Sequence, residues 1–123
     1  VDYANAYLNI SENRLRNFKA SKNKSSKSGY QTKLVAEMIE QNKAAITYMD
    51  KAKKEGTDIK KKNLVKRLCD LLGDQSKTLA HANDEMNKLH TFAQKLEDTV
   101  DAGQDFGSAM EAVEKDLNAA MHW

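Results

Sequence analysis

The chain has 123 residues, a net charge of +2, and 31% charged against 40% hydrophobic residues, which is typical of one folded domain spanning residues 1–123. It has no proline and only five glycines, so little in it interrupts long helices, and no apolar run is long enough to span a membrane. Because the chain begins with Val1, we expect a mature or excised piece of a longer product.

Two helices are predicted in the first half of the chain. Apolar residues recur at helical spacing over residues 2–20, and again over 30–55. The serine- and lysine-rich stretch between them, Ser21–Gly29, predicts a loop. Gly56 suits the left-handed position after a helix end, and Thr57 is a residue type that caps the next helix. Such a short turn predicts that the following helix runs back antiparallel.

The third segment carries the longest apolar pattern. From Leu72 to Val100 the apolar or small positions alternate in steps of three and four, as in a coiled coil. This apolar seam passes through Gly73 in phase, so we expect one helix from about Asp58 to Ala102, roughly 65 Å long. A break at Gly73-Asp74 is the alternative.

A last helix is predicted from Ser108, because Ser108 and Glu111 have the spacing of a capping box. The predicted fold class is therefore all-α, an antiparallel bundle of about four helices organised around a long third helix.

Enzyme, metal and cofactor sites are not expected. His81 and His90 are nine residues apart and face different sides of a helix, so they do not form a metal site. The acidic residues near 97–101 lie on a helix face without the cleft that acid–base catalysis needs. No glycine-rich phosphate loop or serine-nucleophile motif is present. We therefore expect a protein that is not an enzyme and needs no cofactor.

The single cysteine, Cys69, lies among leucines, which favours a small buried hydrophobe over a reactive or dimer-forming thiol. If it were exposed, Lys66 and Arg67 would lower its pKa.

Charge is distributed unevenly along the chain. Residues 1–67 contain 16 lysines and arginines against 7 acids, and residues 68–123 contain 4 against 11. This asymmetry either orients the helices within the bundle or marks a basic surface. The basic residues concentrate between Lys51 and Arg67, and the candidate anion-binding residues are Lys53, Lys54, Lys60, Lys61, Lys62, Lys66 and Arg67.

Exclusion leaves an interaction protein, such as an adaptor, a chaperone-like protein, a secreted virulence component or an extracytoplasmic sensor domain. The seam is longer than any other predicted helix, so we expect its uncovered part, at Leu79, Met86 and Leu89, to bind another protein or a second copy. The alternative function is an anion-binding module, in which the basic cluster contacts nucleic acid or anionic lipid. The sequence indicates no cellular compartment.

Overall fold

The structure is a computed structural model. It describes residues 1–21, 28–79, 85–102, 107–109, 111–112 and 115, with only the backbone of 28 and 85–90. Four helices are defined in it: α1 (Asp2–Ser21), α2 (Ser28–Lys54), α3 (Leu64–Leu79) and α4 (Glu85–Asp101). The described residues contain no strand. The predicted all-α fold is confirmed.

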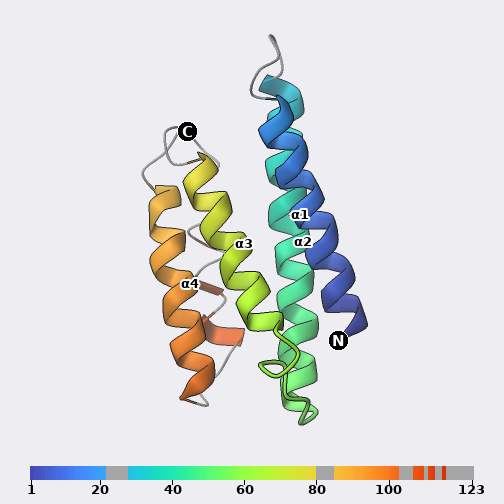
Figure 1. Cartoon of the computed structure of the whole chain (residues 1–123), viewed down its shortest axis with the longest axis vertical. Helices are drawn as coiled ribbons and strands as arrows, with labels where there is room; N and C mark the ends of the chain where they lie inside the picture. Colours follow the sequence, from blue (N-terminus) through green and yellow to red (C-terminus); the bar gives the residue numbers. More distant parts are fainter. Residues whose placement is uncertain (22–27, 80–84, 103–106, 110, 113–114, 116–123) are drawn as a thin grey trace.

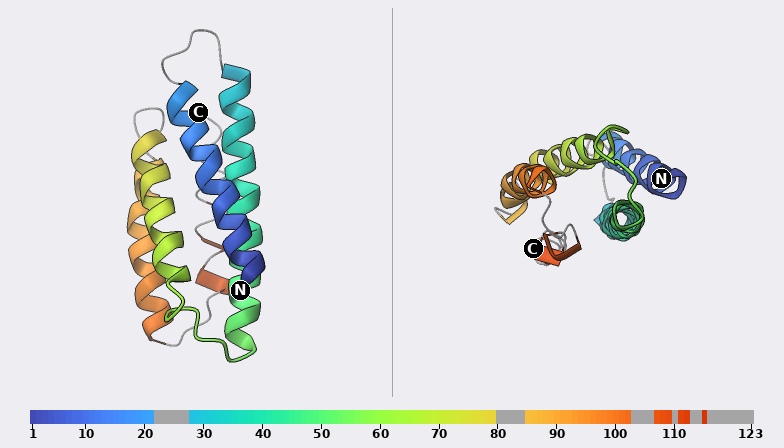
Figure 2. Two further views of the ribbon diagram at one scale, coloured as in Figure 1. Left: turned by 45° about the vertical axis from the view of Figure 1, so that its right-hand side comes forward. Right: turned by 90° about the horizontal axis from the view of Figure 1, so that it is seen from below.

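The helices form two antiparallel hairpins, α1 with α2 and α3 with α4, standing side by side (Figure 1). Viewed along the helices, α4, α3 and α1 form a row, and α2 lies beside α1 in a second layer (Figure 2). α1 makes the broader contact with α3, and a hydrogen bond from Asn42 of α2 to Gln75 of α3 also joins the two hairpins. Of the predicted last helix, residues 107–109, 111–112 and 115 are helical, and the remainder lies outside the described residues.

The first hairpin agrees closely with the prediction. Both helices lie within about two residues of their expected ends, although Ser28 and Gly29 belong to α2 and not to the preceding loop. Residues 22–27 of that predicted loop lie outside the described residues. Gly56 has a φ of 88°, and the amides of Gly56 and Thr57 donate to the carbonyls of Lys53 and Ala52 at 3.0 and 2.9 Å. These are the two hydrogen bonds of a Schellman motif, which ends α2 where the glycine predicted.

The third helix begins later than predicted. α3 starts at Leu64 and not near Asp58, so Thr57 does not cap it. The Asp58 carboxylate instead accepts hydrogen bonds from the amides of Lys60 and Lys61, both at 3.1 Å, which holds residues 58–61 in a turn. Ile59 is buried in this turn and ties it to the core.

The prediction of one long third helix is wrong. α3 ends at Leu79, α4 begins at Glu85, and the two pack against each other as a hairpin (Figure 1). The break at Gly73-Asp74 is also wrong, because α3 continues through both residues. Folding back buries Leu79, Ala93 and Leu96, whereas a single helix of that length would leave much of its apolar seam in water. An apolar repeat specifies a stripe on each helix but not whether the helices are joined end to end.

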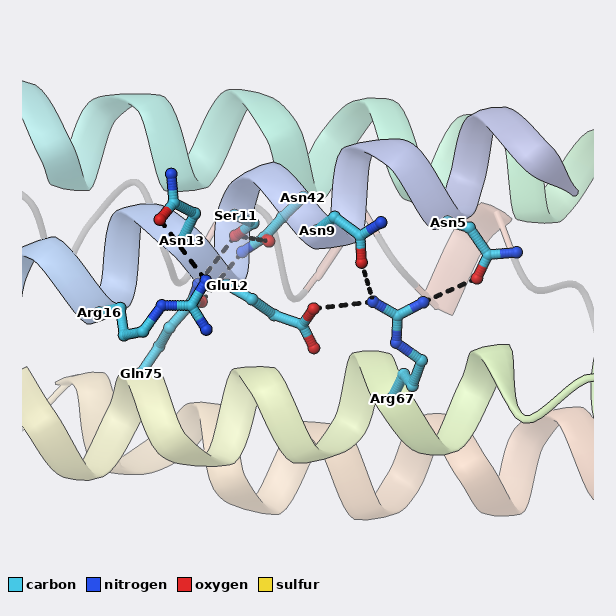
Figure 3. Close-up of polar contacts among 9 residues, drawn as sticks. All are labelled: Asn5, Asn9, Ser11, Glu12, Asn13, Arg16, Asn42, Arg67 and Gln75. Atoms are coloured by element: carbon cyan, nitrogen blue, oxygen red, sulfur yellow. Dashed lines mark hydrogen bonds and ion pairs between the residues drawn. The ribbon is translucent and has the colours of Figure 1, made fainter.

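The core contains one closed ring of buried polar side chains, contributed by three helices (Figure 3). The Ser11 hydroxyl donates to Asn42 Oδ1 at 2.6 Å, Asn42 Nδ2 donates to Gln75 Oε1 at 2.9 Å, and Gln75 Nε2 donates to Ser11 Oγ at 3.1 Å. Each side chain both donates and accepts, and all three are almost fully buried. A buried polar group that keeps its hydrogen-bond partner lowers the free energy of unfolding little. A group that loses its partner lowers it by the full desolvation penalty. The ring therefore fixes how α1, α2 and α3 align.

The Ser11→Ala variant tests this ring. It leaves Asn42 Oδ1 and Gln75 Nε2 without their partners, so we expect the free energy of unfolding to fall by about 1–3 kcal/mol in urea titrations. Thr47→Ala is the matched control, because that exposed hydroxyl donates only to the Lys43 carbonyl of its own helix. Its effect should stay within about 0.5 kcal/mol. Equal effects of the two substitutions would contradict a structural role for the ring.

Candidate functional site

The predicted partner-binding seam is not a free surface where the structure describes it. Leu79 is 1% exposed and packs in the core. Met86 and Leu89 belong to α4, but their side chains lie outside the described part of the chain. With the long helix replaced by a hairpin, the seam no longer gives a reason to expect a partner there.

The predicted anion-binding residues do lie together at one end of the bundle, around the end of α2, the linker of residues 55–63 and the start of α3 (Figure 1). Four of the seven, however, have carboxylate partners. Lys54 pairs with Asp50, Lys60 with Asp101, Lys66 with Asp70 and Arg67 with Glu12. Among the described residues, Lys61 and Lys62 are exposed cations with no ion pair. Anion affinity grows with the number of free cations, so the four ion pairs lower the affinity expected of this cluster. The anion-binding function stays a prediction.

Ion pairs across the helices explain part of the charge asymmetry. Lys60 reaches Asp101, and Lys19 Nζ lies 2.8 Å from Asp74 Oδ2, so in both cases a cation of the basic half meets an acid of the acidic half. Both pairs are largely exposed and each contributes little free energy. They favour the interpretation that the asymmetry orients the hairpins.

Arg67 joins the two hairpins and is not a free anion ligand (Figure 3). From α3, its Nη1 donates to Asn5 Oδ1, and its Nη2 donates to Asn9 Oδ1 and Glu12 Oε1, each at 2.7 Å. All three acceptors lie along one flank of α1. A planar guanidinium can hold several acceptors at once, which a lysine cannot do.

We predict that Arg67→Ala lowers the free energy of unfolding by about 1–2 kcal/mol, because its hydrogen bonds are charge-assisted but only partly buried. Lys66→Ala, at the neighbouring position, removes an exposed pair within one helix and should leave the urea midpoint unchanged. If the lysine variant proved as destabilising as the arginine variant, the bridge between hairpins would not be the cause.

Cys69 is half-buried between α3 and α4, where its thiol donates to the Ala93 carbonyl at 3.0 Å. Burial, followed by the nearby carboxylates of Glu97 and Asp70, raises its pKa to about 12. The preceding Lys66 and Arg67 do not lower it, since both are engaged by carboxylates. The interpretation as a packed small side chain is favoured, and a reactive thiol is not.

Labelling with a thiol reagent checks this. Only the thiolate reacts, so the folded protein should react about a hundred to a thousand times more slowly at pH 8 than the urea-unfolded chain. The rate for the folded protein should keep rising as the pH passes 9, because its raised pKa leaves the thiol protonated there. A plateau near pH 9 would mean that Cys69 ionises like an exposed thiol.

A cluster of three tyrosines, which the sequence pattern did not indicate, joins α1 and α2: Tyr3 is exposed, and Tyr7 and Tyr48 are partly buried. Tyr48 of α2 stacks on Tyr3 and Tyr7 of α1, with ring centroids 5.0 and 5.7 Å apart. Tyr3 is nevertheless 64% exposed. The cluster lies on the flank of α1 that meets α2, whereas Asn5, Asn9 and Glu12 occupy the flank that meets α3.

Further side chains extend this cluster into a strip along α2. Tyr30, which is 46% exposed, precedes Tyr48 by 18 residues, or about five helical turns, so both lie on one face about 27 Å apart. Glu37 and Gln41 lie between them on the same face, and Arg14 of α1 pairs with Glu37. We call this strip the outer face: Tyr3, Tyr7, Arg14, Tyr30, Glu37, Gln41 and Tyr48. The sequence feature that could have indicated this face is the spacing of Tyr30 and Tyr48, which are a whole number of helical turns apart.

Two open clefts are formed by described residues. One, of about 350 Å³, lies between α1 and α3, and its lining mixes Arg16 and Lys19 with Glu12, Asp70 and Asp74. The other, of about 390 Å³, lies between the linker and the end of α4, and mixes Lys53 and Lys60 with Asp58 and Asp101. Neither cleft is lined by side chains of a single sign of charge. Within the described ranges, no three His, Cys, Asp or Glu side chains are placed to share a metal ion, and no helix is long and apolar enough to cross a membrane.

Comparison with known proteins assigns no relative, because the chain matches no protein-family model, no curated protein and no solved structure.

Proposed function

We propose that this chain is a non-enzymatic interaction module that binds a protein chain through the outer face of its α1–α2 hairpin. The observation that carries the proposal is the stacked cluster of Tyr3, Tyr7 and Tyr48, with Tyr3 largely exposed. Tyrosine is among the residues most enriched where binding energy concentrates, because a large ring meets the partner while its hydroxyl stays hydrated.

The stacking supports this role for an energetic reason. Each ring is held by its neighbours before any partner arrives, so less side-chain freedom is lost on binding. The helices that carry the rings are fixed in turn by the buried Ser11–Asn42–Gln75 ring. A non-enzymatic role is supported by the two described clefts, whose linings mix both charges and in which Lys19 pairs with Asp74 and Lys60 with Asp101.

Position-specific photo-crosslinking in the cells that make the protein tests this function. A benzoylphenylalanine at Tyr3 should give discrete crosslinked protein adducts, and the Tyr30→Ser substitution in the same chain should weaken them. The same group at Lys77, an exposed position on α3, is the matched control and should give few adducts. Absence of adducts at Tyr3, or an identical pattern at Lys77, would refute the proposal.

A further inference from the structure

The outer face has the same pattern in both directions along α2. Its members on that helix are Tyr30, Glu37, Gln41 and Tyr48, separated by seven, four and seven residues. Tyr30 and Tyr48 lie at the same angle around the helix axis, and Glu37 and Gln41 lie about 20° to either side of that line. An aromatic side chain therefore stands at each end, and two polar side chains stand in the middle, symmetrically about residue 39.

The centre of the outer face, between Tyr30 and Tyr48, contains one positive and one negative side chain. Arg14 of α1 pairs with Glu37, and both side chains keep 31% of their surface exposed. Beside them, Gln41 Oε1 is buried without a hydrogen-bond partner. The centre of the face thus has a partly exposed ion pair and, beside it, an amide acceptor whose bonding is incomplete.

A surface that presents opposite charges near a centre of symmetry is complementary to itself. When two copies approach with their α2 helices antiparallel, Tyr30 of one copy meets the tyrosine cluster of the other, and each Arg14 approaches the other copy's Glu37. This is the defining property of an interface with twofold symmetry, in which one patch is used by both subunits. Two charge pairs would then form an alternating network of four charges, and rotation of the Gln41 amide would offer its oxygen to a donor across the axis.

We infer that the protein bound by the outer face is a second copy of this chain, packed antiparallel about a twofold axis near residue 39 of α2. The inference rests on the proposed function and names its partner. The contact strip is about 27 Å long and has a charged centre, so the dimer is reversible and dissociates on dilution.

Charge exchange at the centre tests this arrangement. Arg14→Glu gives a chain whose outer face holds only acids at its centre, and Glu37→Arg gives one that holds only bases. Each variant alone should sediment as a monomer at concentrations where the natural chain sediments as a dimer. An equimolar mixture should sediment as a dimer, because each acidic centre meets a basic one.

Three results would overturn the inference. These are a natural chain that stays monomeric up to about 1 mM, a charge variant that dimerises alone, and a mixture of two folded variants that stays monomeric. If circular dichroism shows that a charge variant does not fold, the Tyr3→Ser/Tyr30→Ser chain decides, since it removes only exposed rings. That chain must lose the dimer, whereas Lys77→Ser on α3 must keep it.

The crosslinking at Tyr3 separates this inference from the proposed function. Adducts of twice the chain mass, containing only this sequence, support both. Adducts only with other proteins overturn the dimer and leave the proposed function standing. Absence of adducts, together with a monomeric natural chain, removes both.

Discussion

Three buried polar side chains, Ser11, Asn42 and Gln75, set the alignment on which the rest of this bundle depends. Apolar packing alone tolerates sliding of one helix along another, because one leucine fills the place of the next. A closed ring of hydrogen bonds does not tolerate it, since any shift leaves donors and acceptors buried without partners. The ring therefore places α3 beside both helices of the first hairpin, and α4 folds back on α3 to cover the other side of its apolar stripe.

The alignment of the helices also determines which of their flanks remain exposed and can bind a partner. One flank of α1 is held by Arg67, and the inner sides of α1 and α2 face the core, so the flank shared by α1 and α2 on the far side remains open. The exposed Tyr3 and Tyr30 both lie on that flank, at its two ends. At the basic end of the bundle, by contrast, four of the seven cations singled out are occupied by carboxylates, which leaves a weaker field than the sequence indicates.

Local signals in the sequence predicted local structure well. Helical spacing located α1 and α2, and Gly56 located the end of α2, because these features depend on neighbouring residues only. The sequence did not predict the hairpin of α3 and α4, because apolar residues that keep the same spacing over two helices resemble the seam of one long helix. Asn83 and Asp84 could have indicated the break, since both are residue types that favour a helix start, just before Glu85. The sequence did not predict the tyrosine cluster, because Tyr3 and Tyr48 are far apart in the chain and only the packing of α1 against α2 brings them into contact.

We propose that the outer face is the surface left free for a partner, because the inner sides of the helices are buried in the core and held by the Ser11–Asn42–Gln75 ring. Amide NMR spectra recorded over a dilution series from about 1 mM to 10 μM test it most directly. We expect resonance shifts confined to residues of α1 and α2 around Tyr3, Arg14, Glu37 and Tyr48, with α3 unchanged. Shifts concentrated on α3 or α4, or spectra that do not change with concentration, would contradict it.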